Sequence, residues 1–253
     1  MKVRVLGAYG GEGLDLRTSC LLINDRLAVD AGALTSALSL REQAKVSGIL
    51  ISHTHLDHIH DLGFLADNIF GKRDTPVEIL GTEKSIQVLK KHFFNNRIWP
   101  DFTQIPNSDH PILVCRAFKP GQEIDIAGLK VKPIPVNHPI PSVGFIISDG
   151  KNSLLYSGDT GPTERLWKEA DKLNNLKLVI IEVSFPNQME EVAKLSGHLT
   201  PKMAEAELAK LKEPPAMVRA FHMKPAFIKE LEREMARLKI KITPLKQGEV
   251  IEV

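Results

Sequence analysis

One short segment rich in metal-ligating side chains stands out in the first quarter of the chain. It spans residues 53–58, reads HTHLDH, and directly follows the apolar run at 48–52. Imidazole nitrogen and carboxylate oxygen are ligands of zinc, manganese and iron. A loop at the end of a strand can direct alternate residues to one ion and the intervening residues to a second. The segment therefore predicts a site for two ions rather than a solvated His-rich turn.

Further histidines and acidic residues follow where an apolar run stops and a turn begins. They are His138, Asp159, His198 and His222. Taken singly, His138 is an ordinary loop histidine, Asp159 a turn-forming residue and His222 a buried capping residue. Beside the segment 53–58 we favour metal ligation, because a catalytic metal site needs its coordination completed. Two cations held close together also need anionic charge between them, and Asp159 suits that position.

The length and composition are those of one large domain spanning residues 1–253. The chain of 253 residues is 43% hydrophobic and 25% charged, which is enough apolar material for a substantial core. Its formal net charge is only +2, with basic and acidic residues interspersed, so no nucleic-acid-binding or membrane-binding surface is indicated. A small anionic substrate fits this balance, whereas nucleic acid is not favoured as a partner.

The amino terminus and the cysteines indicate the cellular compartment in which the protein is expected. The chain starts MKVRVLG without an apolar signal region, and no apolar stretch approaches membrane-spanning length, so we expect a cytoplasmic protein. Cys20 and Cys115 are too few for a disulfide framework and lie in apolar surroundings. We expect them to be buried thiols rather than metal ligands.

Apolar and alternating runs predict strands in both halves of the chain. These runs are Val3–Leu6, Cys20–Ile23, Arg26–Asp30, Ile49–Ser52, Val77–Leu80, Leu129–Val136, Gly144–Ser148, Ser153–Ser157 and Leu178–Glu182, with closing edge strands at Lys241–Leu245 and Glu249–Val253. Helical patterns occupy Ser36–Lys45, Glu83–Phe94, Glu164–Leu173, Pro201–Leu211 and Ala226–Leu238. Two β-rich halves that each carry helices predict an α/β fold of two sheets packed face to face with helices outside. The proline-rich segment 137–142 is a candidate crossover between the halves.

The ordered series of motifs resembles the metallo-β-lactamase superfamily over nearly the full chain, from the sequence DAG at 30–32 to His222. The resemblance implies a four-layer αββα sandwich with the site at one edge, between the two sheets. It also implies a ligand set, with His53, His55 and His138 at one ion, Asp57, His58 and His222 at the other, and Asp159 bridging both. The cofactor implied is a pair of divalent metal ions, with zinc favoured and manganese or iron as alternatives. No organic cofactor is expected.

His198 is left over once those ligands are assigned. In the superfamily's phosphodiesterase branches, a glutamate at the end of one strand and a histidine opening the next helix act as a pair, and Glu182 and His198 resemble that pairing. The carboxylate would orient the imidazole and raise its basicity, so that His198 protonates an oxygen leaving group near neutral pH. The alternative is a buried, hydrogen-bonded pair with a structural role only.

The motif details favour one branch of the superfamily. The redox diiron branch carries glutamate where this chain has His55, and thioesterases and β-lactamases lack the glutamate–histidine pair. The transfer-RNA 3′-processing endonucleases usually insert a long arm between the positions of His138 and Asp159, where this chain has a short strand–turn–strand. The closer resemblance is to the class II cyclic-nucleotide phosphodiesterases, carried by HTHLDHI at 53–59, NRIWPDF at 96–102, EVSF at 182–185 and GHLTP at 197–201.

Four further side chains bear on the substrate. Asp61 stands where that family prefers a small residue, and we expect it with His60 in the first exposed turn of a helix, where an acidic residue suits the amino-terminal dipole. Trp99 and Phe102 are candidates for stacking on a purine. A hydrophobic lid or a homodimer contact is the alternative for both.

The sequence therefore predicts a dinuclear-metal phosphodiesterase that hydrolyses 3′,5′-cyclic nucleotides to nucleoside monophosphates, with a small anionic phosphodiester as its partner. A ribonuclease Z-like endonuclease or another hydrolase of the same fold is the first alternative. A redox diiron protein and a catalytically silent, metal-stabilised sensor are further alternatives, the sensor being disfavoured because no ligand is missing.

Overall fold

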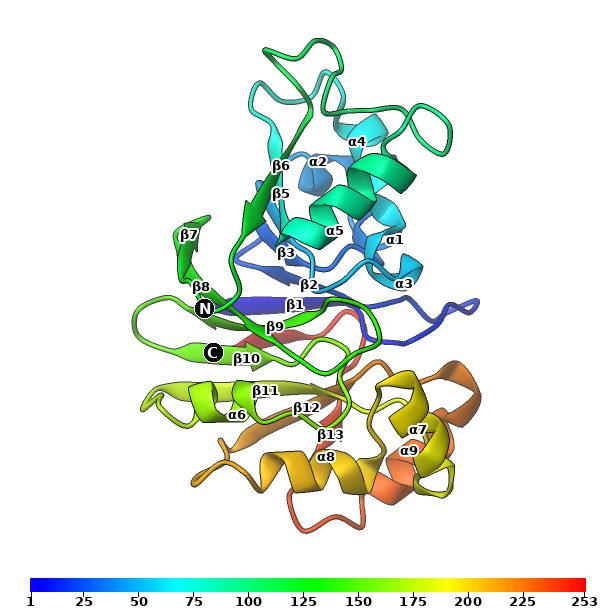
Figure 1. The fold of residues 1–253 in the computed structure, drawn as a ribbon, viewed down its shortest axis with the longest axis vertical. Coiled ribbons are helices and arrows are strands. Elements are labelled where there is room, and N and C mark those ends of the chain that lie inside the picture. Colours follow the sequence, from blue (N-terminus) through cyan, green and yellow to red (C-terminus); the bar gives the residue numbers. More distant parts are fainter.

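The computed structural model describes residues 1–253 and contains two seven-stranded sheets (Figure 1). The strands of the first sheet are β1 (Lys2–Gly7), β2 (Cys20–Ile23), β3 (Leu27–Val29), β4 (Gly48–Leu50), β5 (Val77–Thr82), β6 (Leu113–Phe118) and β14 (Val250–Glu252). Their order is β14-β1-β2-β3-β4-β5-β6. Neighbours from β14 to β3 pair antiparallel, and those from β3 to β6 pair parallel.

The second sheet repeats this arrangement with the later part of the chain. Its strands are β7 (Ile124–Ile126), β8 (Leu129–Pro135), β9 (Val143–Ser148), β10 (Ser153–Tyr156), β11 (Leu176–Glu182), β12 (Met217–Phe221) and β13 (Thr243–Pro244). Their order is β13-β12-β11-β10-β9-β8-β7, antiparallel from β7 to β10 and parallel from β10 to β13.

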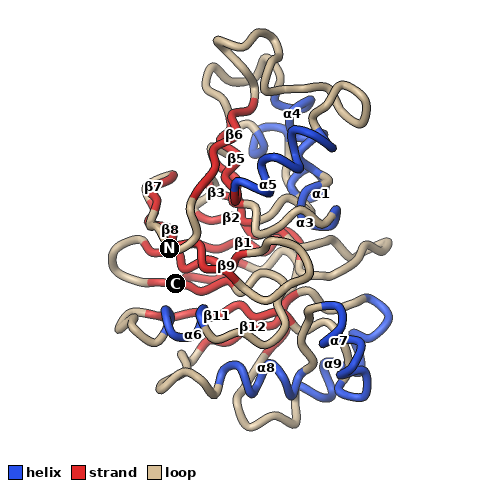
Figure 2. The backbone as a smooth tube through the Cα atoms, in the orientation of Figure 1, coloured by secondary structure: helices blue, strands red, loops and turns tan.

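Helices cover the outer face of each sheet (Figures 1 and 2). On the first sheet lie α1 (Leu34–Ala37), α2 (Leu40–Gln43), α3 (Leu56–Ile59), α4 (Asp61–Ile69) and α5 (Glu83–Val88), the last continued by a π-helical turn at Leu89–Phe93. On the second lie α6 (Arg165–Ala170), α7 (Glu190–Ser196), α8 (Pro201–Leu208) and α9 (Ile228–Met235), with 3₁₀ turns at Asn187–Met189 and Pro225–Phe227. None of the helices combines the length and the apolar character needed to cross a lipid bilayer.

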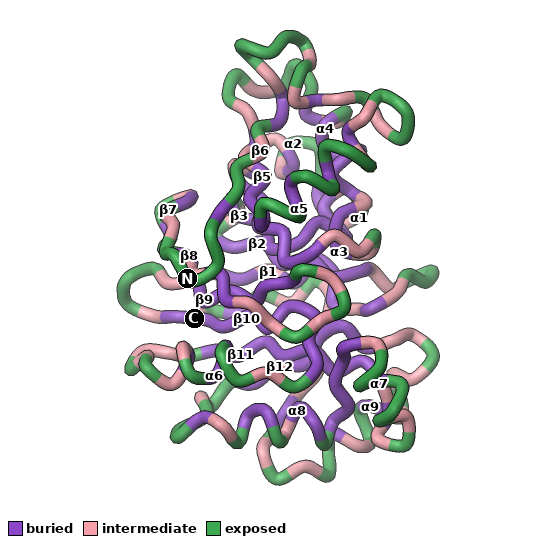
Figure 3. Tube along the Cα trace, viewed as in Figure 1, coloured by how far each residue is buried: buried purple, intermediate pink, exposed green.

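Three buried apolar clusters separate these layers. One lies between the sheets and one between each sheet and its helices. In β11, Leu178 and Ile180 belong to the cluster between the sheets, whereas Val179 and Ile181 pack against the helices. Successive side chains of a strand point to opposite faces, so a strand buried on both faces reads as a continuous apolar run. The buried segments accordingly run through the middle of the molecule in Figure 3, and the expected αββα sandwich is confirmed.

The differences from the predicted elements have local causes. β6 and β7 were not predicted, because both are edge strands in which exposed side chains interrupt the apolar pattern. The helix predicted at 36–45 is broken, because the Ser39 side chain accepts from the Glu42 amide while the Glu42 carboxylate accepts from the Ser39 amide at 2.9 Å, which starts α2 afresh. The segment 137–142 is not a crossover: it joins the antiparallel neighbours β8 and β9 within one sheet, and the chain changes sheets between β6 and β7.

Candidate metal centre

The predicted ligands gather at one edge of the sandwich because they follow the carboxyl ends of strands. His53 comes three residues after β4, His138 three after β8, Asp159 three after β10 and His222 directly after β12. Parallel neighbours such as β10, β11 and β12 end at the same edge of a sheet. The edge therefore collects side chains from both sheets, and residues far apart in the sequence become neighbours.

The first group of ligand atoms consists of three imidazole nitrogens. His53 Nε2 lies 3.1 Å from His55 Nδ1, and His138 Nε2 lies 3.2 Å from the same His55 Nδ1. All three atoms lie within 4.8 Å of one another. Three nitrogens that converge in this way can bind a single cation between them.

The second group pairs two imidazoles with carboxylates. Asp57, His58 and His222 offer atoms within 4.8 Å of one another, and His222 Nε2 lies 3.1 Å from Asp57 Oδ2. Asp159 Oδ2 lies 3.1 Å from His222 Nε2, 3.4 Å from His58 Nε2 and 3.7 Å from His53 Nε2. Asp159 thus reaches both groups, as the predicted bridging position requires.

Hydrogen bonds on the far side of the rings fix which nitrogen faces the centre. His58 Nδ1 donates to Asp30 Oδ2 at 2.8 Å, and His138 Nδ1 donates to the Gly197 carbonyl at 2.9 Å. The Ser52 hydroxyl lies 3.0 Å from His53 Nδ1, and the Ser184 hydroxyl 2.9 Å from His222 Nδ1. Such partners orient the Nε2 atom of metal-ligating histidines and raise its basicity.

The donor set fits divalent cations. His58 Nε2 and Asp159 Oδ1 are buried, yet neither has a hydrogen-bond partner. A buried polar atom without a partner costs free energy, and a bound cation would satisfy both atoms. Burial holds the pKa of His53 well below its usual range, and burial also lowers the pKa of His55 and of His138. These rings are therefore neutral near pH 7, which is the form that binds metal.

In the second group, neighbouring groups of opposite charge outweigh the effect of burial on the pKa values. Burial alone would raise the pKa of Asp159, but the neighbouring His222 and His58 outweigh burial and hold it well below its usual range. Burial likewise opposes a charge on His58, but Asp159 and Asp30 raise its pKa well above the usual value. Asp57 behaves like Asp159: burial opposes its charge, and the hydrogen bond to His222 lowers its pKa overall. Both carboxylates are therefore ionised at neutral pH.

Glu182 and His198 form a buried pair beside this centre. His198 Nδ1 lies 2.8 Å from Glu182 Oε1, and the same carboxylate accepts from the Thr160 amide at 3.2 Å and from the Ser184 hydroxyl at 2.9 Å. Burial opposes a charge on His198, but Glu182 outweighs burial and raises its pKa. The His198 ring is stacked on His222 with centroids 5.2 Å apart. The pair thus borders the second ligand group, and His198 also lies near Asp159.

Sequence reasoning missed Asp30, which organises one side of the site. This fully buried carboxylate accepts from the Ser52 amide and hydroxyl, from His58 Nδ1 and from the Tyr156 hydroxyl, each at 2.8 Å. Its backbone φ of 57° lies in the left-handed region, which Asp tolerates better than most residues. The available signal was an acidic residue directly after the buried run 27–29, followed by Ala31-Gly32.

Removing one partner of Asp30 tests this role. We expect Tyr156→Phe to lower the free energy of unfolding by roughly 1–3 kcal/mol, because a hydrogen bond to a charged acceptor is lost inside the core. Chemical denaturation of the metal-free protein measures the change. Tyr9→Phe is the matched control, because no hydrogen bond of the Tyr9 hydroxyl is present in the structure. Equal stabilities for Tyr156→Phe and the unchanged protein would contradict the role of Asp30.

Two side chains, Asp61 and Phe102, lie elsewhere than expected. Asp61 is only 3% exposed, and its carboxylate accepts a hydrogen bond from the Thr35 amide at 2.7 Å. It therefore joins α4 to α1 and does not lie in an exposed turn. Phe102 is 4% exposed within the apolar cluster of the first sheet, so neither a base nor a partner subunit can cover it. Trp99 is half-buried against Gly63 and Phe64, with ring centroids of Trp99 and Phe64 5.1 Å apart. Cys20 is buried as predicted, whereas Cys115 is only partly buried.

The clustered ligands and the relatives of the chain together identify a metal-dependent hydrolase. The chain belongs to the β-lactamase superfamily, because the model of the Beta-lactamase superfamily domain matches residues 25–223. It is 30% identical to a probable 3′,5′-cyclic-nucleotide phosphodiesterase of Yersinia pestis, over 84% of this chain and 72% of that protein.

Solved structures share the fold over the whole chain. Unliganded yeast PDE1 superposes with a TM-score of 0.78 and 22% identity, covering 98% of both chains. The metallo-β-lactamase fold protein YhfI from Bacillus subtilis also gives a TM-score of 0.78, with 21% identity and coverage of 99% of this chain and 98% of that one. The match of the family model and the 30% identity to the Yersinia pestis protein confirm the recognition of the superfamily from sequence.

Proposed function

We propose that this chain hydrolyses phosphodiesters, first among them the 3′,5′-cyclic phosphate of nucleoside monophosphates. The observation that carries the proposal is the buried Glu182–His198 pair, with 2.8 Å between carboxylate oxygen and imidazole nitrogen, beside the ligand groups. A hydrolysis that expels an alkoxide needs a proton donor at the leaving oxygen. The similarity to the Yersinia pestis protein supports the same substrate class.

Two divalent ions are part of the proposal. His53, His55 and His138 would hold one, Asp57, His58 and His222 the other, and Asp159 would contact both. When bound, such ions supply Lewis-acid stabilisation of the phosphate charge and make water more acidic. The nitrogen-rich donor set favours zinc, with manganese and iron as the alternatives.

His198 has the surroundings of a proton donor. Glu182 holds its Nδ1, so the opposite nitrogen, Nε2, is the one that can deliver a proton. The Ser184 hydroxyl contacts Glu182 at 2.9 Å and His222 Nδ1 at 2.9 Å, which ties the position of the pair to that of a proposed ligand. The chain's own residues thereby orient the donor before any substrate binds.

The short connection between His138 and Asp159 supports a small substrate over a transfer-RNA precursor. Only the loop to β9, the β9–β10 turn and these two strands lie between them. No projecting arm that could grip a folded RNA is present there (Figure 1). The net charge of only +2 gives little overall electrostatic attraction to a polyanion such as RNA.

A substrate panel tests the proposal. We expect the protein, loaded with zinc or manganese, to convert 3′,5′-cyclic nucleotides to nucleoside monophosphates without added flavin or nicotinamide, and to hydrolyse bis(p-nitrophenyl) phosphate as well. Chromatography of the products provides the measurement, and chelator-treated protein is the control. Cleavage of a transfer-RNA precursor without activity on cyclic nucleotides would replace the proposal by the endonuclease alternative. Stoichiometric flavin or reductant-driven oxygen consumption would move it to the redox branch.

A further inference from the structure

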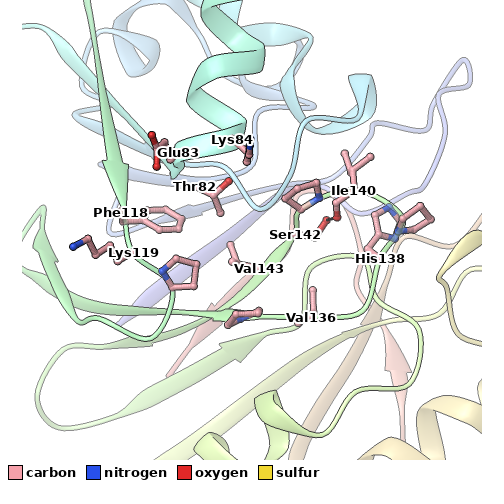
Figure 4. Close-up of a pocket in the computed structure, with 14 residues that line it drawn as sticks. Thr82, Glu83, Lys84, Phe118, Lys119, Val136, His138, Ile140, Ser142 and Val143 are labelled. Carbon is pink, nitrogen blue, oxygen red and sulfur yellow. Dashed lines mark hydrogen bonds between the residues drawn. The ribbon is translucent and has the colours of Figure 1, made fainter.

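A cleft of about 570 Å³ opens beside the metal centre, and one of its walls is His138 (Figure 4). Three segments build it: the start of α5 at 82–84, the link after β6 at 118–120, and the chain from the end of β8 to the start of β9 at 135–143. Its volume lies within the range of about 300–1,000 Å³ usual for small-ligand sites.

Most of the lining is apolar and stiff. It includes four prolines together with Phe118, Val136, Ile140 and Val143. Phe118 is only 6% exposed and packs edge-to-face on Phe145, with ring centroids 6.0 Å apart. Proline fixes its own backbone φ, so a wall rich in proline loses little freedom when a ligand binds. Such a cleft suits a flat apolar group.

The cleft and the proposed phosphate site share one side chain, His138. His138 Nε2 faces the first ligand group, 3.2 Å from His55 Nδ1, while its ring also lines the cleft. Figure 4 shows His138 and Phe118 at opposite ends, with Val136 and Val143 between them. A diester whose phosphate lies at the centre would therefore extend its organic substituent past His138 and towards Phe118.

The polar residues of the rim favour an anionic molecule. Lys84 and Lys119 are the two basic residues that line the cleft. Glu83 is the one acidic residue of the lining. The rim thus carries an excess of positive charge, which raises the local concentration of an anionic substrate.

We propose that this cleft binds the nucleoside part of a nucleotide diester, with the base lying against the partly exposed Val136 and Ile140. The inference rests on the proposed function, because it takes the phosphate to lie at the centre. An apolar wall covers the face of any base, so the cleft selects nucleosides over small alkyl substituents rather than one base over another.

Two substrates with the same leaving group test the cleft. Thymidine 5′-(p-nitrophenyl) phosphate and methyl p-nitrophenyl phosphate both release nitrophenolate, and they differ only in the group that would occupy the cleft. We expect kcat/KM to be at least about tenfold higher for the thymidine ester, which is the effect of burying a few apolar carbons. Ile140 is a half-buried residue of the wall beside His138, and Ile140→Trp would fill part of the cleft with a larger side chain. This variant should lower the ratio by about tenfold, mainly by raising KM for the thymidine ester.

A matched variant and a binding measurement complete the test. Val250→Trp adds the same side chain at a position that is 53% exposed on β14 and away from the cleft, and it should leave the ratio unchanged. In titration calorimetry, 5′-AMP should bind the unchanged protein at least about tenfold more tightly than inorganic phosphate, and Ile140→Trp should remove most of that difference. Equal kcat/KM values for the two esters would overturn the nucleoside site, and so would a ratio that Ile140→Trp does not alter. Either result would leave the proposed function unaffected. No hydrolysis of either ester or of a 3′,5′-cyclic nucleotide would instead refute the proposed function.

Discussion

Replacing Asp159 by alanine is expected to release at least one of the two divalent ions and to abolish most of the activity. The Asp159 carboxylate lies 3.1 Å from His222 Nε2 and 3.7 Å from His53 Nε2, so it is the one acid that contacts both ligand groups. Two unit charges about 4 Å apart interact by about 4 kcal/mol at an effective dielectric constant of about 20. Losing one such interaction corresponds to roughly 10³-fold weaker binding of an ion.

The measurement is metal per chain after dialysis, by elemental analysis, together with turnover of a cyclic nucleotide. Asp159→Asn keeps the shape of the side chain without its charge, so a loss of metal in both variants assigns the effect to charge rather than to a cavity. Asp125→Asn, at a side chain that is 80% exposed, controls for the general effect of removing a carboxylate. Two ions fully retained by Asp159→Ala would refute the bridging position.

The ligands could be predicted because their positions after apolar runs in the sequence correspond to positions at the ends of strands. Each follows an apolar run, and such runs become strands whose ends meet at one edge. The residues that hold the ligands were not predictable in the same way. Ser52 and Ser184 are ordinary residues in the sequence, and their hydrogen bonds to His53 and His222 appear only when the strands are placed.

The side chains that lie elsewhere than predicted are those whose burial depends on packing between distant segments. The sequence around Asp61 describes the start of a helix correctly, but not that the Thr35 amide from another helix would reach its carboxylate. Phe102 lies in a polar stretch and still enters the core beneath the first sheet. The cleft beside His138 could not be predicted either, because three separate segments of the chain, 82–84, 118–120 and 135–143, come together to line it.

The exchange of His198 for alanine is expected to separate the proton donor from the metal ligands. The variant should keep both ions and lose roughly 10²- to 10⁴-fold in turnover of a cyclic nucleotide, the usual contribution of a positioned general acid. Nitrophenolate leaves without a proton, so the loss on a nitrophenyl diester should be much smaller. Glu182→Gln should show a weaker form of the same selectivity, because it disturbs the 2.8 Å contact that orients the ring but leaves the imidazole in place.

Parallel assays on the two substrates, with metal content measured on the same samples, provide the test. His92→Ala, at an exposed histidine of the π-helical turn, is the matched control and should change neither rate. Thermal unfolding of His198→Ala identifies any loss that comes from leaving the buried Glu182 carboxylate with only the Thr160 amide and the Ser184 hydroxyl as donors. Equal losses on both substrates with the ions retained would mean that His198 binds the phosphate or shapes the pocket. Loss of an ion would make His198 a ligand, which its position near Asp159 and His222 allows.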